Sequence, residues 1–245
     1  MSDMSAGHED DPRFETRYVE RFEDTGDGGA VTLLGVVHDH PASVYRVRRV
    51  LDRESPDVLA LELPPPAVGL FEEYADDDRT PPRFGGEMSA AVQAAATDDV
   101  VGIDGPTVAF CRRLAARLVD ERASAETVAQ TLRGLAGVTK KTLLCRAAAA
   151  VGGATSLQVE VGSPAAHAAT HADPPAQQAA DERSQIRRAN SVLAALESTP
   201  ASKYRSAVRE RHMAERLGDH RRRGDVVAVV GVGHFDPIVD YLGAA

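Results

Sequence analysis

Two segments of the chain carry the same arrangement of glycine, histidine and proline. The first, LLGVVHDHP, contains Gly35 and His38, and the second, VVGVGHFDP, contains Gly231 and His234. Glycine permits a sharp turn or a close approach at the end of a strand. The histidine that follows would lie at the carboxyl edge of an α/β sheet, where ligands bind. The positive end of a following helix disfavours the imidazolium form, and a neutral imidazole serves as a metal ligand or a general base. The repeat predicts that His38 and His234 share one site.

Glu62 is the third residue of this constellation, because it lies late in the apolar run DVLALEL. A carboxylate flanked by leucines is unfavourable to bury unless it is paired or bound to a metal. Two histidines and one glutamate form a divalent-metal set with open positions for water, suited to manganese, cobalt, zinc or iron. Glu62 would be the third ligand or the base that deprotonates the bound water. A buried salt bridge to an arginine is the alternative.

Other residues give weaker signals. His40 follows His38 by two residues and either caps a helix or lies at the mouth of the site. Asp104 ends a short apolar run and is equally a site residue or a turn former. His167 and His171 have a spacing of four residues that would suit a metal on a helix, but they lie in low-complexity sequence and are better explained as loop residues.

Apolar runs bounded by glycine, proline and charge predict the strands that must position these residues. We expect strands at 31–37, 57–63, 99–104 and 225–234, and an edge strand around 17–22. A helix over 43–53 separates the first two long strands, which favours a parallel pair with a right-handed crossover. The fold class predicted is α/β, with a single mixed or mostly parallel sheet flanked by helices and both histidine motifs at the carboxyl ends of strands.

Helical patterning accounts for most of the rest. We expect helices at 87–97, 108–135, 140–151 and 181–223, the last broken at Pro200, and a short one from Asp236. Residues 152–180 are rich in alanine, glycine and proline and predict a flexible insertion. The organisation expected is a polar lead-in over 1–29 and one domain over 30–243.

Composition limits the function. The 245 residues carry a formal net charge of −9, which argues against a general nucleic-acid binder. No run approaches the length of a membrane-spanning helix and no secretory signal is recognisable, so a cytoplasmic protein without an integral membrane segment is expected. An acidic, lysine-poor, alanine-rich chain suggests adaptation to high salt. Homo-oligomers are compatible with this sequence.

The ordered motifs resemble the TraB/PrgY/Tiki superfamily. Its members show GxxH, a serine five residues later, a helix and then PD-hydrophobic-EL, and a second GxxH after a later strand. Other parts are also similar: Gly86-Glu87 before an alanine-rich helix, Gly-Ile-Asp104, an arginine eight residues after Asp104, and RERHMA in place of Arg-Asp-x-x-Met-Ala. The matching residues are Gly35, His38, Ser43, Pro56, Asp57, Glu62, Glu87, Asp104, Arg112, Arg209, Glu210, Gly231 and His234.

The resemblance implies a mixed α/β domain with both GxxH motifs at one site. The wider superfamily includes Tiki metalloproteases, erythromycin-esterase-like enzymes and haem-binding lipoproteins of the ChaN type. It implies a divalent-metal-dependent hydrolase, with a peptide or another small molecule as substrate. His38, His234 and Glu62 would hold the metal. Arg209 would balance the carboxylates or stabilise an oxyanion, unless it is an ordinary surface arginine. A binding protein without turnover, which sequesters a peptide, haem or metal, is the alternative from another class.

Overall fold

The computed structural model describes residues 11–23, 26, 28–154, 161, 165–196 and 200–244. Within them a five-stranded sheet has the order β1-β2-β5-β3-β4, in which β2, β5, β3 and β4 are parallel and β1 pairs antiparallel with β2. This confirms the predicted α/β fold with one mostly parallel sheet. The strands are β1 (Val19–Phe22), β2 (Val31–Val36), β3 (Val58–Leu61), β4 (Val100–Gly102) and β5 (Val226–Gly231).

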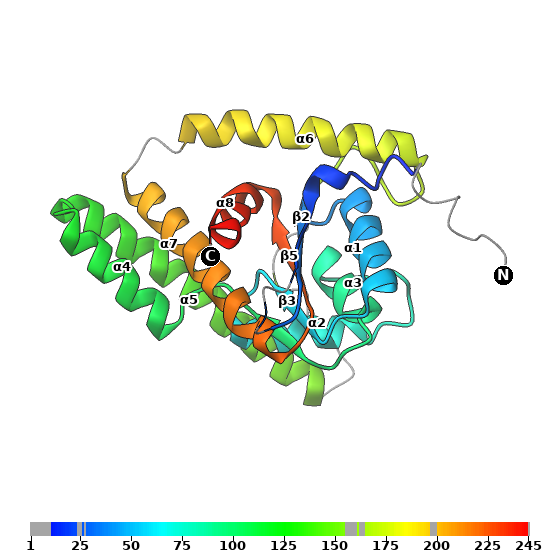
Figure 1. Ribbon diagram of the computed structural model, residues 1–245, viewed down its shortest axis with the longest axis horizontal. Coiled ribbons are helices and arrows are strands. Elements are labelled where there is room, and N and C mark those ends of the chain that lie inside the picture. Colours follow the sequence, from blue (N-terminus) through cyan, green and yellow to red (C-terminus); the bar gives the residue numbers. More distant parts are fainter. Residues whose placement is uncertain are drawn as a thin grey trace.

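Helices cover both faces of the sheet (Figure 1). Short 3-10 turns lie at Thr16–Tyr18, Pro65–Ala67 and Arg221–Arg223. The helices are α1 (Pro41–Glu54), α2 (Val68–Ala75), α3 (Gly86–Ala94), α4 (Val108–Asp120), α5 (Ala125–Ala154), α6 (Pro175–Leu196), α7 (Pro200–His220) and α8 (Val232–Gly243).

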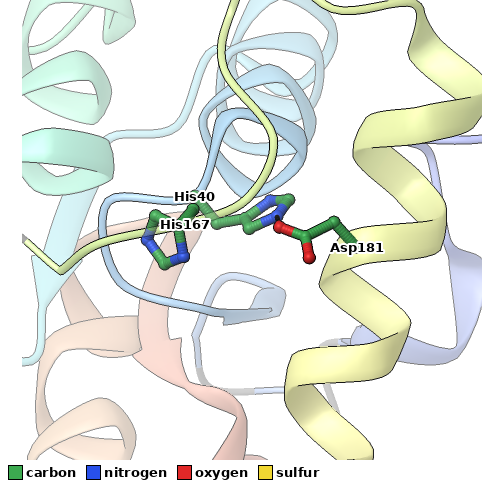
Figure 2. Close-up of side chains that lie close together, drawn as sticks. All are labelled: His40, His167 and Asp181. Atoms are coloured by element: carbon green, nitrogen blue, oxygen red, sulfur yellow. Dashed lines mark hydrogen bonds and ion pairs between the residues drawn. The ribbon is translucent and has the colours of Figure 1, made fainter.

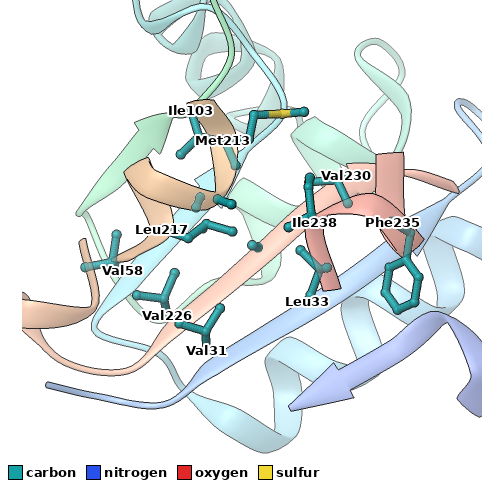
Figure 3. Close-up of a cluster of buried hydrophobic side chains, with 13 residues drawn as sticks. Val31, Leu33, Val58, Ile103, Met213, Leu217, Val226, Val230, Phe235 and Ile238 are labelled. Carbon is teal, nitrogen blue, oxygen red and sulfur yellow. The ribbon is translucent and has the colours of Figure 1, made fainter. Parts of the chain in front are cut away.

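The sheet has a buried core on each side. On one face, Met213 and Leu217 of α7 and Phe235 of α8 pack against strand residues such as Leu33 (Figure 3). On the other face, apolar residues of α1 and α3 pack against alternate strand residues. Because β2 and β5 are buried on both faces, they read as continuous apolar runs in the sequence.

The predicted helix and strand bounds need four corrections. The strand expected to reach His234 ends at Gly231, because the register pairs Gly231 with Val36, the last residue of β2. His234 therefore lies in the first turn of α8. The helix break expected between 135 and 140 is wrong, because α5 continues through it. The break falls at 121–124 instead, where the Ser124 hydroxyl accepts the amide of Thr127 at 3.2 Å.

The other two corrections concern segments that the sequence pattern did not resolve into helices. The sequence pattern predicts no helix or strand at 65–75, but these residues form a 3-10 turn and α2. The region 152–180 is helical at both ends, since α5 runs to Ala154 and α6 begins at Pro175. Residues 155–160 and 162–164 lie outside the described residues. None of the described helices has the length and apolar character needed to cross a membrane.

Candidate functional site

The carboxyl ends of the parallel strands bring the predicted site residues to one edge of the sheet. His38 follows β2 by two residues, Glu62 follows β3 directly, and Asp104 follows β4 by two residues. His234 is the third residue of α8, which begins where β5 ends. Parallel strands present their carboxyl ends on the same side, so four separate segments meet here.

Gly231, the glycine of the second motif, lies beside His38 of the first motif and Glu62. Its amide donates a hydrogen bond to Oε2 of Glu62 at 2.7 Å. A Cβ added at Gly231 would lie 3.2 Å from Nε2 of His38 and 3.4 Å from Oε2 of Glu62. The second glycine is thus required because the first motif's histidine and the glutamate approach its Cα closely, as the sequence pattern suggested.

Arg209 of α7 is the hub of the site. Its guanidinium donates two hydrogen bonds to Asp104, at 2.9 and 2.8 Å, and one to Oε1 of Glu62 at 2.8 Å. Its Nη1 atom also lies 3.0 Å from Nε2 of His234. The side chains of Glu62 and Asp104 are almost buried, and Asp104 lies beside the other candidate site residues while it also accepts the amide of Gly105 at 2.7 Å. Burial opposes the charge of Arg209, but the bonds to Asp104 and Glu62 outweigh it and raise the pKa of Arg209 above its ordinary value.

Each motif histidine has a carboxylate at Nδ1. For His38 it is Oε1 of Glu87, at 2.6 Å, and the other oxygen of Glu87 accepts the amide of Asp39 at 2.7 Å. For His234 it is Oε1 of Glu210, at 3.1 Å. Both rings are therefore oriented with Nε2 directed away from these carboxylates, and Nε2 of His234 lies 3.5 Å from Oε1 of Glu62. Carboxylate–histidine pairs of this kind orient metal-ligating imidazoles.

The electrostatics of His38 differ from the sequence-based expectation. A helix begins three residues after it, and its positive end was expected to favour a neutral imidazole. Instead, the hydrogen bond that Nδ1 of His38 donates to Glu87 raises the pKa of His38 to about 9. The charges of Glu87, Glu62 and Asp39 add to this effect, and burial opposes it. The excess of carboxylates outweighs the helix terminus.

The remaining predicted residues have different roles. Gly35 is packed against Phe235, whose ring carbon would lie 3.1 Å from an added Cβ, so this glycine serves packing rather than the site. His40 caps α1: its Nδ1 accepts the amide of Ala42 at 3.1 Å. Arg112 is exposed on α4, and its neighbour Arg113 faces His212 instead.

A cavity of about 1060 Å³ opens beside the site. His38, Glu62, Glu87 and Asp104 lie on its polar side. Its lining also includes an apolar group of residues: Phe71 and Tyr74 of α2, Phe84, Pro81, Pro82 and Met88. The Tyr74 ring lies 5.8 Å from that of Phe71 and 5.7 Å from that of Phe84, measured between centroids. Sequence reasoning missed this apolar group, although Phe71 and Tyr74 have the i, i+3 spacing of a helix face.

A second group of metal-ligand types lies nearby. Donor atoms of His40, His167 and Asp181 all lie within 4.8 Å of one another (Figure 2). In the sequence, the spacing of His167 and His171 pointed to this region. In the structure His167 lies with His40 and Asp181, and His171 is not part of the group.

Comparisons with family models, with curated proteins and with solved structures found no match for this chain. The resemblance to the TraB/PrgY/Tiki superfamily thus rests on the motifs and their order.

Proposed function

We propose that the protein is a divalent-metal-dependent hydrolase that acts on peptides. The observation that carries this proposal is the matched pair of histidines, each held at Nδ1 by a carboxylate. Nε2 of His234 lies 3.5 Å from Glu62, and Nε2 of His38 and Oε2 of Glu62 both lie beside Gly231. Two donor atoms bound to one tetrahedral ion at about 2.0–2.1 Å lie roughly 3.4 Å apart. The 3.5 Å between His234 Nε2 and Glu62 Oε1 fits this separation.

The charge of the site also fits a cation. Glu62 and Asp104 pair with Arg209. Glu87 and Glu210 contact the two motif histidines, so four carboxylates take part in these contacts with one arginine. The same carboxylates raise the pKa of His38, so an ion bound at Nε2 would have to displace a proton. Arg209 would have to release Glu62 and His234 before they could hold a metal, and its two hydrogen bonds to Asp104 would keep it in the site.

When bound, the metal ion would polarise a carbonyl group and lower the pKa of a bound water towards about 7. The chain's own residues supply the rest. Glu87 and Glu210 hold the rings of His38 and His234 in place. Glu62 either binds the ion or accepts the proton of the attacking water at Oε1. Arg209, fixed by Asp104, donates a hydrogen bond to the oxyanion that develops on the substrate.

The adjoining cavity supports a peptide as the substrate. Its volume is at the upper end of the range for ligand pockets, large enough for several residues. The aromatic group of Phe71, Tyr74 and Phe84 suits an apolar side chain, placed next to a peptide bond that reaches His38 and Glu62.

Metal content tests the proposal directly. The protein is purified in multimolar salt without an affinity-column metal and subjected to elemental analysis. Its affinity for Mn²⁺ and Zn²⁺ is then measured by calorimetry. We expect about one ion per chain in wild type and none in the double variant His38→Ala/His234→Ala. The control variant His171→Asn removes an exposed histidine and keeps the ion. Absence of metal from wild type, even after loading, contradicts the proposal.

Turnover is tested next with a peptide library analysed by mass spectrometry. Glu62→Gln should abolish cleavage, and its metal content distinguishes the two roles of Glu62: metal is lost if Glu62 is a ligand and retained if it is the base.

One observation favours a binding protein without turnover as the second candidate. Arg209 already donates to Nε2 of His234 and to Glu62, the atoms that would bind the ion, and so occupies these ligands without metal. That candidate predicts peptide binding without metal and without cleavage, and Glu62→Ala would then leave much of the binding intact.

A further inference from the structure

Residues of α6 and of the segment before it contact the loop that carries His38, and the GxxH motif does not predict these contacts. His167 places its Nε2 atom 2.8 Å from the backbone carbonyl oxygen of His38. Its Nδ1 atom lies 2.8 Å from Oε1 of Gln185 on α6. The Nε2 atom of Gln185 in turn donates to Asp181 at 2.9 Å. Residues about 130 positions away in sequence thus contact the main chain of the first motif.

Asp181, which accepts the hydrogen bond from Gln185, also contacts His40, two residues after His38. It accepts hydrogen bonds from the amide of Ala169 at 3.1 Å and from Nε2 of His40 at 3.3 Å. The rings of His40 and His167 pack edge to face, with centroids 4.9 Å apart. Figure 2 shows His40 between His167 and Asp181.

These hydrogen bonds argue against the trio of His40, His167 and Asp181 as a metal site. Nδ1 of His40 accepts the amide of Ala42, so the ring proton lies on Nε2, the atom that would have to bind the ion. Both nitrogens of His167 face carbonyl oxygens, which only accept hydrogen bonds. The ring nitrogens of both histidines are thus directed at groups of this chain.

A second network from α6 fixes the residues before His38. Glu182 accepts the Ser43 hydroxyl at 2.5 Å and pairs with Arg46. The Ser43 oxygen accepts the amide of Val37 at 2.8 Å, and Arg46 donates to the carbonyl oxygen of Gly35 at 2.8 Å. Ser43, Arg46 and Glu182 are fully or almost fully buried. Breaking such a buried network leaves polar groups unsatisfied, so its geometry is strongly specified.

We propose that α6 and the segment before it form a clamp on the first GxxH loop, in which His167, Asp181, Glu182 and Gln185 are positioning residues for His38. Main-chain groups of Gly35, Val37 and His38 each contact a member of this clamp or a side chain held by it. Glu87 of α3 also holds this loop, through Nδ1 of His38 and the amide of Asp39. The proposal rests on the proposed function for its effect on metal binding and catalysis, but its structural effect is measurable without metal.

Among the described residues, the clamp residues contact the first motif and not the residues that hold His234. They contact the His38 loop, whereas His234 is held by Glu210 and Arg209 of α7. Loss of a clamp residue should therefore disturb His38 and leave His234 in place. A general loss of stability would disturb both.

The test uses the full chain with 15N-labelled histidine and compares His167→Ala with wild type at one pH. We expect the ring nitrogen signals of His38 to shift and broaden while those of His234 stay unchanged. His167→Gln keeps a donor for the His38 carbonyl and should restore the His38 signals in part. Arg188→Ala changes an exposed arginine on α6, the helix of the proposed clamp, and is the control.

The functional readout is the affinity for Zn²⁺ by calorimetry. Loss of a side chain that orients a ligand typically lowers metal affinity about 10–100-fold, and we expect His167→Ala to fall in that range with Arg188→Ala unchanged. Unchanged His38 signals would overturn the clamp, as would equal shifts of His38 and His234 with a lower unfolding midpoint. If wild type binds no Zn²⁺, the proposed function fails, and the His38 signals still decide the clamp.

Discussion

The Nδ1 atom of His38 lies 2.6 Å from Oε1 of Glu87, a carboxylate that is buried although the imidazole beside it is about half exposed. The partners come from the loop after β2 and from the first turn of α3. Left-handed backbone at Gly85 and Gly86 allows α3 to begin close to Asp39, whose carboxylate would lie 2.2 Å from a Cβ on Gly86. The glycine pair is thus needed to bring Glu87 to the histidine.

Glu87→Gln should lower the pKa of His38 from about 9 towards its ordinary value of 6.5, because it removes the hydrogen-bonded charge that stabilises the imidazolium. A titration of the His38 ring signals by NMR measures this. The raised pKa stabilises the native protein fully below 6.5, and this contribution disappears as pH rises through about 9. The stability difference between wild type and variant should shrink across that range. A His38 pKa that stays near 9 in the variant contradicts the assignment to Glu87.

Gly231→Ala should impair metal binding and turnover more than stability. The new methyl group would press on Nε2 of His38 at 3.2 Å and on Oε2 of Glu62 at 3.4 Å, while the backbone at Gly231 (φ −61°, ψ 142°) is allowed for alanine. Calorimetry with Zn²⁺ and a denaturation curve separate the two effects. Gly218→Ala is the control, because its Cβ meets nothing within 4 Å in α7 and alanine should stabilise the helix by about 0.5–1 kcal/mol.

Arg209→Ala should abolish turnover but keep the metal. The substitution leaves the buried carboxylates of Glu62 and Asp104 without their cation, and we expect a loss of about 1–3 kcal/mol in the free energy of unfolding. It also frees Nε2 of His234, so the affinity for Zn²⁺ should be equal to or higher than that of wild type.

The matched control for Arg209 lies on the same helix. Arg211→Ala removes an exposed pair with Glu215 and should change stability by less than about 0.5 kcal/mol. A variant Arg209→Ala that loses its metal would show that the arginine supports the ligands instead of competing with the ion.

Acid should destabilise the fold below pH 6.5. Burial lowers the pKa of His40, His212 and His220, so these residues are neutral in the native protein at pH values where the unfolded chain is already protonated. Their contribution to stability is present above 6.5 and is lost as pH falls below it. His38 acts in the opposite direction, but between 9 and 6.5, outside this window.

Urea denaturation in high salt at a series of pH values from 7 to 5 measures this effect. His212→Gln should make the decline less steep, because glutamine does not titrate. A stability that is constant or rises from pH 7 to 5 would contradict the role of the buried histidines.

Much of the site could be predicted from local sequence. The Gly-Val-x-His repeats and the acidic residue in DVLALEL mark strand ends, and parallel strands present their carboxyl ends together. That His38, Glu62, Asp104 and His234 gather at one edge follows from this pattern once the strands are assigned. The exact end of β5 did not follow, because it depends on where its partner β2 stops.

The sequence by itself determined the α/β class, the central strands and four of the segments that form the site, because buried parallel strands require continuous apolar runs and these are read directly from the chain. Only the tertiary structure decided which charges face each other. It paired His38 with Glu87, His234 with Glu210 and Arg209 with Asp104. It also brought Glu182 of α6 against Ser43, and Asp181 and Gln185 of α6 against His40 and His167 beside the first motif. Hydrogen bonds between distant segments leave no periodic signature, since each requires only one polar side chain at the right place in space.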